Sequence, residues 1–381
     1  MTRVAVERSL ITWARERAGR SLESLALRFP KLPDWESGDL QPTLKQLEDF
    51  ARAVHVPVGY MFLLAPPEEP VPIPDFRTMA GASLDRPTPD LLDTIYVCQQ
   101  RQEWYNGFAR EMGDPPPPFV GSLRVGDDVV RSAATIREAL GFDVAARRRM
   151  STWTDALRLF IQQADEVGVL VMVSGVVGSN NHRKLDPTEF RGFALADPLA
   201  PLVFINGADT KAAQMFTLAH ELAHIWLGET ALSDTQAFDV PKQTIERWCN
   251  QVAAELLVPL DLFNAEHDPQ AELGPELERL ARRFKVSTLV ILRRMHDVGT
   301  LRGDRYWAAY EAEAQRLQSF PRSSGGDFYL TLGARVSKRF ARAIVVSTLE
   351  GRSSFTEAFR LLGFKKMATF HELGRELGVG F

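Results

Sequence analysis

The stretch FTLAHELAH at residues 216–224 places two histidines four positions apart, with a glutamate directly after the first of them. Its apolar residues recur at helical spacing, and this pattern predicts an amphipathic helix over residues 212–227 that ends at Gly228. Side chains at positions i and i+4 of a helix lie on one face, so His220 and His224 can reach the same metal ion. The stretch therefore predicts a metal-binding helix.

Glu221 follows the first histidine and projects toward a different part of the same site. A carboxylate there can hydrogen-bond a metal-activated water, take its proton and later deliver it to a leaving amine. H-E-x-x-H on a helix is the pattern of the zincin peptidases. A chance match on a buried helix is the competing interpretation, but the helical context and a β-rich run just upstream, at residues 202–205, favour a peptidase.

A catalytic zinc site needs a third protein ligand and keeps one position for water. The further histidine that metzincins carry shortly after such a glycine does not follow Gly228. Glu246 lies on the next predicted helix, residues 245–257, and Asn250 follows one turn later, where it can steady a ligand by hydrogen bonding. The carboxylates that remain alternative third ligands are Glu229, Asp234, Asp239 and Glu255.

The remaining segments mix helical and strand periodicity. Helices are expected at residues 91–112, 128–140, 153–167, 277–284 and 287–297, and strands at 169–173, 190–195 and 202–205. The predicted fold class is α+β and mostly helical, with a zincin-like peptidase core and a small β-sheet, preceded by a helical domain and followed by a small C-terminal domain.

The Pro-rich run at residues 66–74 cannot form a helix or a central strand and marks the clearest domain boundary. A second linker is expected at SSGG, residues 323–326. The predicted order is a helical domain at 1–65, a Pro-rich linker at 66–87, a helical connector at 88–150, the peptidase domain at 151–300 and an α/β tail at 301–381.

Composition bounds the class of protein. The chain has 381 residues, of which 45% are hydrophobic and 25% charged, and a formal net charge of -4, as in an ordinary soluble globular protein. No signal-peptide pattern opens the chain, and no run approaches the roughly 20 apolar residues of a membrane helix. Cys98 and Cys249 are the only cysteines, which suits a reducing cytoplasm better than a disulfide framework.

Several blocks together resemble the ImmA/IrrE family of metallopeptidases. They are RGFAL at 191–195, FIN at 204–206, FTLAHELAH at 216–224, IERWCN at 245–250 and AAELLVP at 253–259, in the order found in the family. The resemblance covers about residues 150–300. It implies that His220, His224 and Glu246 are the metal ligands and that Glu221 is the catalytic base. Asn250, His182 and Arg191 are candidates for supporting a ligand or stabilising a tetrahedral intermediate.

The resemblance also implies an activity. Members of the family are zinc-dependent, site-specific endopeptidases that cut XRE-type repressors or antitoxins in the bacterial cytoplasm and so relieve transcriptional repression. We therefore expect a gluzincin-like metallo-endopeptidase that takes Zn²⁺, with Mn²⁺ as an alternative, and acts on a regulatory or toxin-antitoxin protein encoded nearby. The alternative function is a regulator or antitoxin with little or no catalysis that binds a partner protein or DNA.

The N-terminal domain resembles an XRE-type helix-turn-helix through LESLA at 22–26, WESG at 35–38 and Pro42-Thr43. Pro30 and Pro33 leave little room for a recognition helix between the first two blocks, and the domain is not basic. We expect it to contact protein rather than DNA. Residues 280–294 also resemble a helix-turn-helix with a basic face, for which packing against the peptidase core is the favoured interpretation.

Overall fold

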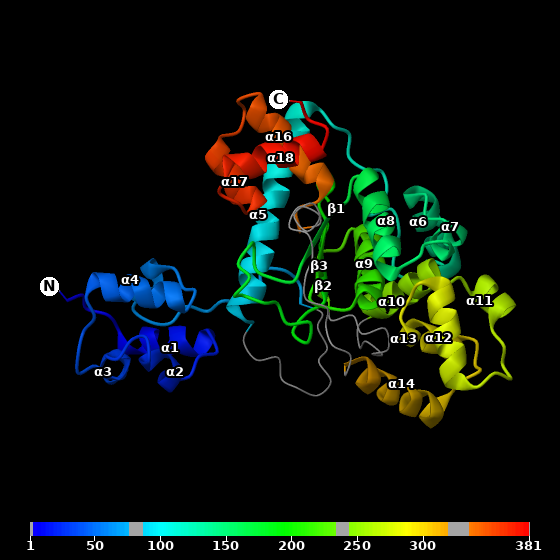
Figure 1. Ribbon diagram of the computed structural model, residues 1–381, viewed down its shortest axis with the longest axis horizontal. Helices are drawn as coiled ribbons and strands as arrows, with labels where there is room; N and C mark the ends of the chain where they lie inside the picture. Colours follow the sequence, from blue (N-terminus) through cyan, green and yellow to red (C-terminus); the bar gives the residue numbers. More distant parts are fainter. Residues whose placement is uncertain (1–2, 76–86, 234–243, 319–334, 381) are drawn as a thin grey trace. The chain divides into compact units, whose positions relative to one another are not determined.

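The computed structural model describes residues 3–75, 87–233, 244–318 and 335–380 (Figure 1). The chain divides into two compact units, one made of residues 1–72 and 81–93 and the other of residues 73–80 and 94–381. None of the helices in the described part has the length and apolarity that a bilayer-spanning helix requires. The fold is mostly helical with one four-stranded sheet, which confirms the predicted α+β class.

The N-terminal unit is a bundle of short helices around its own apolar core. Its elements are α1 (Arg8–Arg17), α2 (Leu22–Ala26), α3 (Leu32–Ser37), α4 (Leu44–Ala53) and the 3-10 turn η1 (Val58–Phe62). Trp35 and Phe50 pack edge to face in this core, with ring centroids 6.2 Å apart. Thr43 caps α4 in a capping box with Gln46.

Helix α3 corrects one expectation in part. We expected Pro30 and Pro33 to leave little room for a recognition helix able to enter a major groove, and six residues form a helix there. Pro33 lies in the first turn of α3, where the missing N–H has no intrahelical acceptor and the fixed φ suits a helix. The helix is nevertheless short, and Gly38 ends it in the left-handed conformation.

The second unit is built on a sheet with strand order β1-β3-β2-β4. Strand β1 (Leu170–Ser174) runs parallel to β3 (Leu202–Asn206), and β2 (Gly192–Leu195) runs antiparallel to both β3 and β4 (Ala231–Ser233). The three expected strands are confirmed. The edge strand β4 was not predicted, because three residues are too few to show a period of two.

Helices cover both faces of the sheet (Figure 1). Helices α8 (Trp153–Glu166) and α9 (Lys211–Leu227) lie on one face and share a core with alternate strand residues such as Val171, Val203 and Ile205. Helix α5 (Pro89–Met112) lies on the other face, where Gln102 donates to the carbonyl of Leu195 at 2.8 Å. Burial on two faces explains why β1 and β3 are continuous apolar runs.

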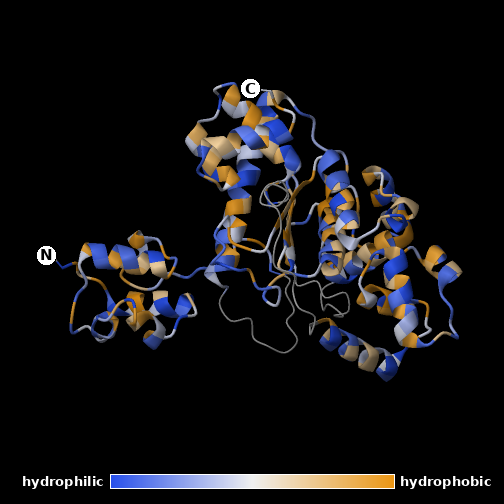
Figure 2. Cartoon of the chain, viewed as in Figure 1, coloured by the Kyte–Doolittle hydropathy of each residue, from blue (hydrophilic) through white to orange (hydrophobic). Residues whose placement is uncertain are grey.

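The second unit contains further helices up to residue 318. They are α6 (Val129–Leu140), α7 (Val144–Arg148), α10 (Thr244–Leu257), α11 (Leu260–Glu266), α12 (Leu273–Phe284), α13 (Thr288–Asp297) and α14 (Gly303–Gln318). Of these, α10 packs directly on α9. Figure 2 shows hydrophobic and hydrophilic residues interleaved along these helices, as expected when one side of each helix is buried. Leu280, Phe284 and Ile291 of the α12–α13 pair belong to the same core as α9.

The C-terminal segment corrects a second expectation. Its described residues, 335–380, contain the helices α16 (Lys338–Leu349), α17 (Phe355–Leu362) and α18 (Met367–Glu376) and no strand, so this part is not an α/β tail. The run AIVV at 343–346 has β-rich composition but lies within α16, because Phe340 and Ile344 repeat at helical spacing and are buried together. The expected linker at 323–326 lies outside the described residues.

Candidate metal centre

Helix α9 carries the H-E-x-x-H pattern. Thr210 caps its start by accepting a hydrogen bond from the Ala213 N–H, and Gly228 ends it in the left-handed conformation. The residues from Gln214 to Trp226 are all buried, so the helix is not the amphipathic one we expected. The sheet, α8 and α10 pack around it, and a helix enclosed in this way loses the polar face that a surface helix keeps.

Helix α10 lies beside α9 and completes a group of three metal-ligand side chains. The ligand-type atoms of His220, His224 and Glu246 all lie within 4.8 Å of one another, and the three residues are buried. The two Nε2 atoms are 3.0 Å apart. Glu246 reaches both, with Oε2 3.3 Å from Nε2 of His220 and Oε1 3.0 Å from Nε2 of His224.

Asn250 orients one of these imidazoles. Its Oδ1 lies 2.9 Å from Nδ1 of His220. An amide oxygen can only accept, so His220 carries its proton on Nδ1 and directs the lone pair of Nε2 toward His224 and Glu246. The predicted supporting role of Asn250 therefore has a geometric basis, one helical turn from Glu246.

The donor set fits a divalent cation. Burial lowers the pKa of His224, which keeps that ring neutral. Burial alone would raise the pKa of Glu246, but the two imidazoles outweigh it and hold that pKa well below its usual range. Two imidazole nitrogens and one carboxylate, converging in a buried site, are the ligands that a tetrahedral zinc site with an open position uses.

Glu221 lies on the same helix and is fully buried. No hydrogen-bond donor of suitable geometry reaches either of its oxygens in the described part of the chain. Burial and the charge of Glu246 raise the pKa of Glu221 well above its usual value, and the Ser233 hydroxyl opposes the rise only in part. A carboxylate with a raised pKa is better suited to accept and return a proton near neutral pH.

Gly192 of β2 makes room for this carboxylate. A Cβ atom added at Gly192 would lie 2.6 Å from Cγ2 of Thr217, 2.8 Å from the carbonyl oxygen of Phe204 and 3.2 Å from Oε1 of Glu221. The start of β2 therefore approaches α9 too closely for any side chain. Sequence reasoning missed Gly192 and Ser233, although Gly192 lies in the quoted block RGFAL; a glycine inside a β-rich run is the signal that could have found it.

The other predicted residues are not part of the ligand group. Arg191 pairs with Asp209 at 2.9 Å. His182 is exposed in a turn where its backbone N–H bonds to Asn180, and it does not belong to the ligand group. Of the alternative ligands, Glu229 is exposed, Glu255 pairs with Arg294 at 2.9 Å, and Asp234 and Asp239 lie outside the described residues.

Comparisons with known proteins point to the same region. Residues 164–296 match the family model of the IrrE N-terminal-like domain, and residues 336–376 match a domain of unknown function (DUF8813). The chain is similar to the radiation response metalloprotease IrrE of Deinococcus deserti, with 38% identity over 96 residues, and to that of Deinococcus radiodurans, with 32% over 148 residues.

These similarities are partial. They cover 24% and 38% of this chain and 34% and 43% of the two relatives, so the chain spans less than half the length of either. They support the ImmA/IrrE family and a metallopeptidase-type domain in residues 164–296, which contains His220, His224 and Glu246.

Proposed function

We propose that this chain is a zinc-dependent endopeptidase of the gluzincin type, with His220, His224 and Glu246 as metal ligands and Glu221 as general base. The convergence of two imidazoles and one carboxylate within 4.8 Å, beside a buried carboxylate with a raised pKa, is the observation that carries the proposal. The similarity to metalloproteases named in two Deinococcus species supports it. Mn²⁺ is the alternative ion.

The chain's own residues have separate parts in this reaction. A divalent cation held by the three ligands would lower the pKa of a water molecule and polarise a peptide carbonyl. Glu221 accepts the proton of the attacking water and returns it to the leaving amine. Asn250 keeps His220 in the tautomer that directs Nε2 at the site. Burial of the three ligands and of Glu221 excludes bulk water and strengthens the electrostatic interactions among them.

We further propose that the substrate is a cytoplasmic XRE-type repressor or antitoxin-like protein. The N-terminal unit, proposed as an XRE-like domain at residues 1–65, supports this. It carries nine Lys/Arg and ten Asp/Glu over residues 1–72, and α3 has only six residues, so it is better suited to protein contact than to DNA. Cys98 and Cys249 are free and buried, which suits a reducing compartment.

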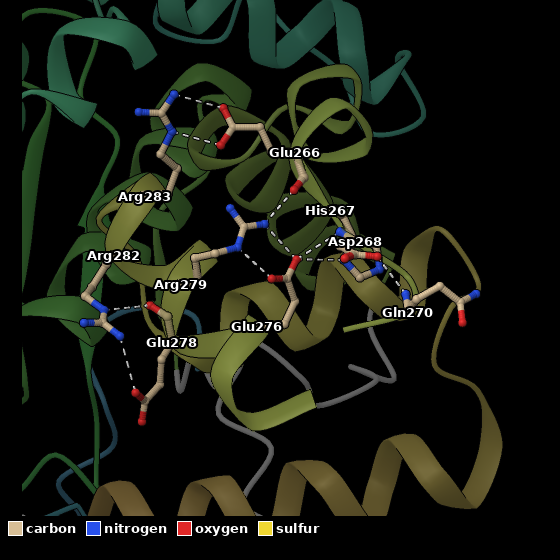
Figure 3. A network of polar contacts seen from close by, with 9 residues as sticks. All are labelled: Glu266, His267, Asp268, Gln270, Glu276, Glu278, Arg279, Arg282 and Arg283. Atoms are coloured by element: carbon tan, nitrogen blue, oxygen red, sulfur yellow. Dashed lines mark hydrogen bonds and ion pairs between the residues drawn. The ribbon is translucent and has the colours of Figure 1, made fainter. Parts of the chain in front are cut away.

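The second helix-turn-helix-like segment packs as part of the peptidase region. Arg294 of α13 is buried against Glu255 of α10 and so faces inward. The arginines of α12 are engaged by neighbouring carboxylates, as Figure 3 shows for Arg279 with Glu276, Arg282 with Glu278 and Arg283 with Glu266. Arginines that are already paired with carboxylates, or that are buried as Arg294 is, are poorly placed to neutralise DNA phosphates, and this supports the packing interpretation.

Exchange of Glu221 for Gln tests the proposed reaction. Gln is close in shape to Glu but cannot accept the proton, so Glu221→Gln should lower cleavage of candidate partner proteins by about 10²- to 10⁴-fold while metal content stays near wild type. His220→Ala should lose both metal and cleavage. Fragments are followed by mass spectrometry beside zinc content. Cleavage by Glu221→Gln at the wild-type rate would favour the binding-regulator alternative.

A further inference from the structure

A recess lies on the face of the sheet opposite the candidate metal centre. It is lined from α5 by Val97, Cys98 and Arg101, and from the strand side by Ser174 and Phe204, with Arg335 closing it just before α16. The recess contains about 260 Å³ of space, including solvent at its mouth. It therefore reaches solvent and could admit a small group from outside.

Two of the lining side chains are cations without a carboxylate partner. Arg101 is 6% exposed. Its guanidinium donates to the carbonyl oxygens of Leu361 at 2.9 Å and Arg335 at 3.2 Å and approaches Sδ of Met172 at 3.4 Å, and these acceptors are neutral. Among the residues that the structure describes, no carboxylate pairs with Arg101 or Arg335. The charge of Arg101 is thus buried and uncompensated.

Arg335 adds a second observation. Its Nε is inaccessible to solvent and has no hydrogen-bond partner in the described part of the chain. Arg294 in the same unit is buried against a carboxylate, whereas Arg147 is buried, like Arg101, with a backbone carbonyl as acceptor. A buried donor without a partner is costly, and a buried charge without a counter-charge more so. An anion that entered the recess would supply both a hydrogen-bond acceptor and a counter-charge.

We propose that this recess binds an oxyanion group, a phosphoryl or carboxylate group of a small molecule, between Arg101 and Arg335. Guanidinium groups suit such ligands because their planar N–H donors match pairs of anionic oxygens. Ser174 also lines the recess, but its hydroxyl donates to the carbonyl of Val176 at 2.7 Å, so the two arginines are the groups that attract the anion. The enclosed part has room for about one water-sized atom, so an oxygen of the charged group enters and the rest of the ligand lies at the mouth.

The competing explanation is that Arg101 only fastens α5 to the end of α17. Its bond to the Leu361 carbonyl fits that role, since cations are favoured near the last carbonyls of a helix. Such a role needs neither the charge of Arg335 nor the open space. Variants at Arg335 and in the lining of the recess therefore separate the two explanations, while Arg101 is left intact.

The test measures thermal unfolding of the full chain during titration with sodium phosphate and, separately, sodium acetate at constant ionic strength. A ligand that binds only the folded state raises the melting temperature in a saturable way. We expect saturable stabilisation by at least one of the two anions; phosphate alone would indicate a phosphoryl ligand and acetate alone a carboxylate. Absence of saturable stabilisation by both would overturn the proposal.

Three variants locate the effect. Arg335→Gln should weaken the apparent affinity about tenfold or more, the usual loss when one charged hydrogen bond is removed. Val97→Leu fills space in the recess and keeps both cations, and it should weaken binding as well. Arg342→Gln removes the same charge from an exposed position on α16 and should bind like wild type. Equal stabilisation in all four proteins would place the anion elsewhere and contradict the proposal.

Discussion

His220 has different neighbours at its two ring nitrogens, a hydrogen-bond acceptor at Nδ1 and the candidate metal centre at Nε2. Oδ1 of Asn250 accepts a hydrogen bond from the Nδ1–H of His220 at 2.9 Å, and Glu246 and His224 face Nε2. The tautomer that a metal ligand needs is thus set before an ion arrives. A side chain that fixes a ligand in this way contributes to metal affinity although it does not touch the ion.

Removal of this hydrogen bond should weaken metal binding. We expect Asn250→Ala to lower zinc affinity about 10- to 100-fold, because the imidazole of His220 loses its orientation. Asn250→Asp is the matched control, since its carboxylate still offers an acceptor oxygen, and it should retain metal. Competition titration with a chelator measures both. Equal affinity in wild type and Asn250→Ala would show that the contact with Asn250 does not orient the ring.

Gly192 is the second decisive single residue. Its α-hydrogen faces Thr217, the Phe204 carbonyl and Glu221, and two of these contacts would fall below 3.0 Å with a Cβ present. We expect Gly192→Ala to destabilise the folded state by about 1–3 kcal/mol, as overpacked cores do, and to displace Glu221. Chemical denaturation measures the loss.

Gly274→Ala serves as control for this substitution. Nothing lies within 4 Å of a Cβ at Gly274 and its φ is negative, so the same change should be neutral or slightly stabilising there. If both variants unfolded at the same denaturant concentration, the close approach of β2 to α9 would not be what requires glycine.

At the level of elements, α10 presents different faces to different neighbours. Glu246 and Asn250 are one turn apart and face α9, whereas Glu255, nine positions after Glu246, lies half a revolution away and pairs with Arg294 of α13. Helical periodicity alone separates Glu255 from Glu246 in this way. The proximity of His220, His224 and Glu246 could therefore be predicted from the sequence, because it depends only on which face of two neighbouring helices each residue occupies.

Elements whose sequence shows no clear helical or strand period could not be predicted in this way. Strand β4 has three residues, and α3 begins with a proline in its first turn. The run at 343–346 is β-rich by composition yet helical by packing. In each case tertiary burial decides the conformation, and local propensity over so few residues is too weak to compete with it.

The junction of α11 and α12 gives a pH-dependent prediction (Figure 3). Arg279 chiefly, helped by the Asp268 N–H and His267, holds the pKa of Glu276 down at about 2, below its usual value of about 4.5. A depressed folded-state pKa stabilises the fold above the unfolded-state pKa, and this contribution disappears as pH falls from about 4.5 to about 2.

Glu276→Gln should therefore cost about 1–2 kcal/mol at pH 7, a figure reduced for the solvent exposure of Arg279, and nothing near pH 2. Glu278→Gln removes an exposed carboxylate from the same helix and should have almost no effect at either pH. Urea unfolding across this pH range measures the difference. A constant deficit for Glu276→Gln from pH 7 to pH 2 would contradict the pKa shift.

On the scale of the whole molecule, the motif-bearing region and the N-terminal unit have separate cores. The sequence predicted that His220, His224 and Glu246 lie close together, because they belong to one helix and its neighbour. It did not predict the close approach at Gly192 or the recess at Arg101 and Arg335, since these join segments far apart in the chain. Long-range packing of this kind leaves no local period to detect.

Metal content of the purified full chain tests the central claim most directly. We predict about one divalent ion per chain in wild type and in Glu229→Gln, which changes an exposed rival carboxylate, because a site with three protein ligands holds its ion through purification. Glu246→Ala should retain less than about a tenth of that amount, since two imidazoles alone bind weakly. Wild-type occupancy in Glu246→Ala, measured by elemental mass spectrometry on folded protein, would contradict the assignment of the third ligand.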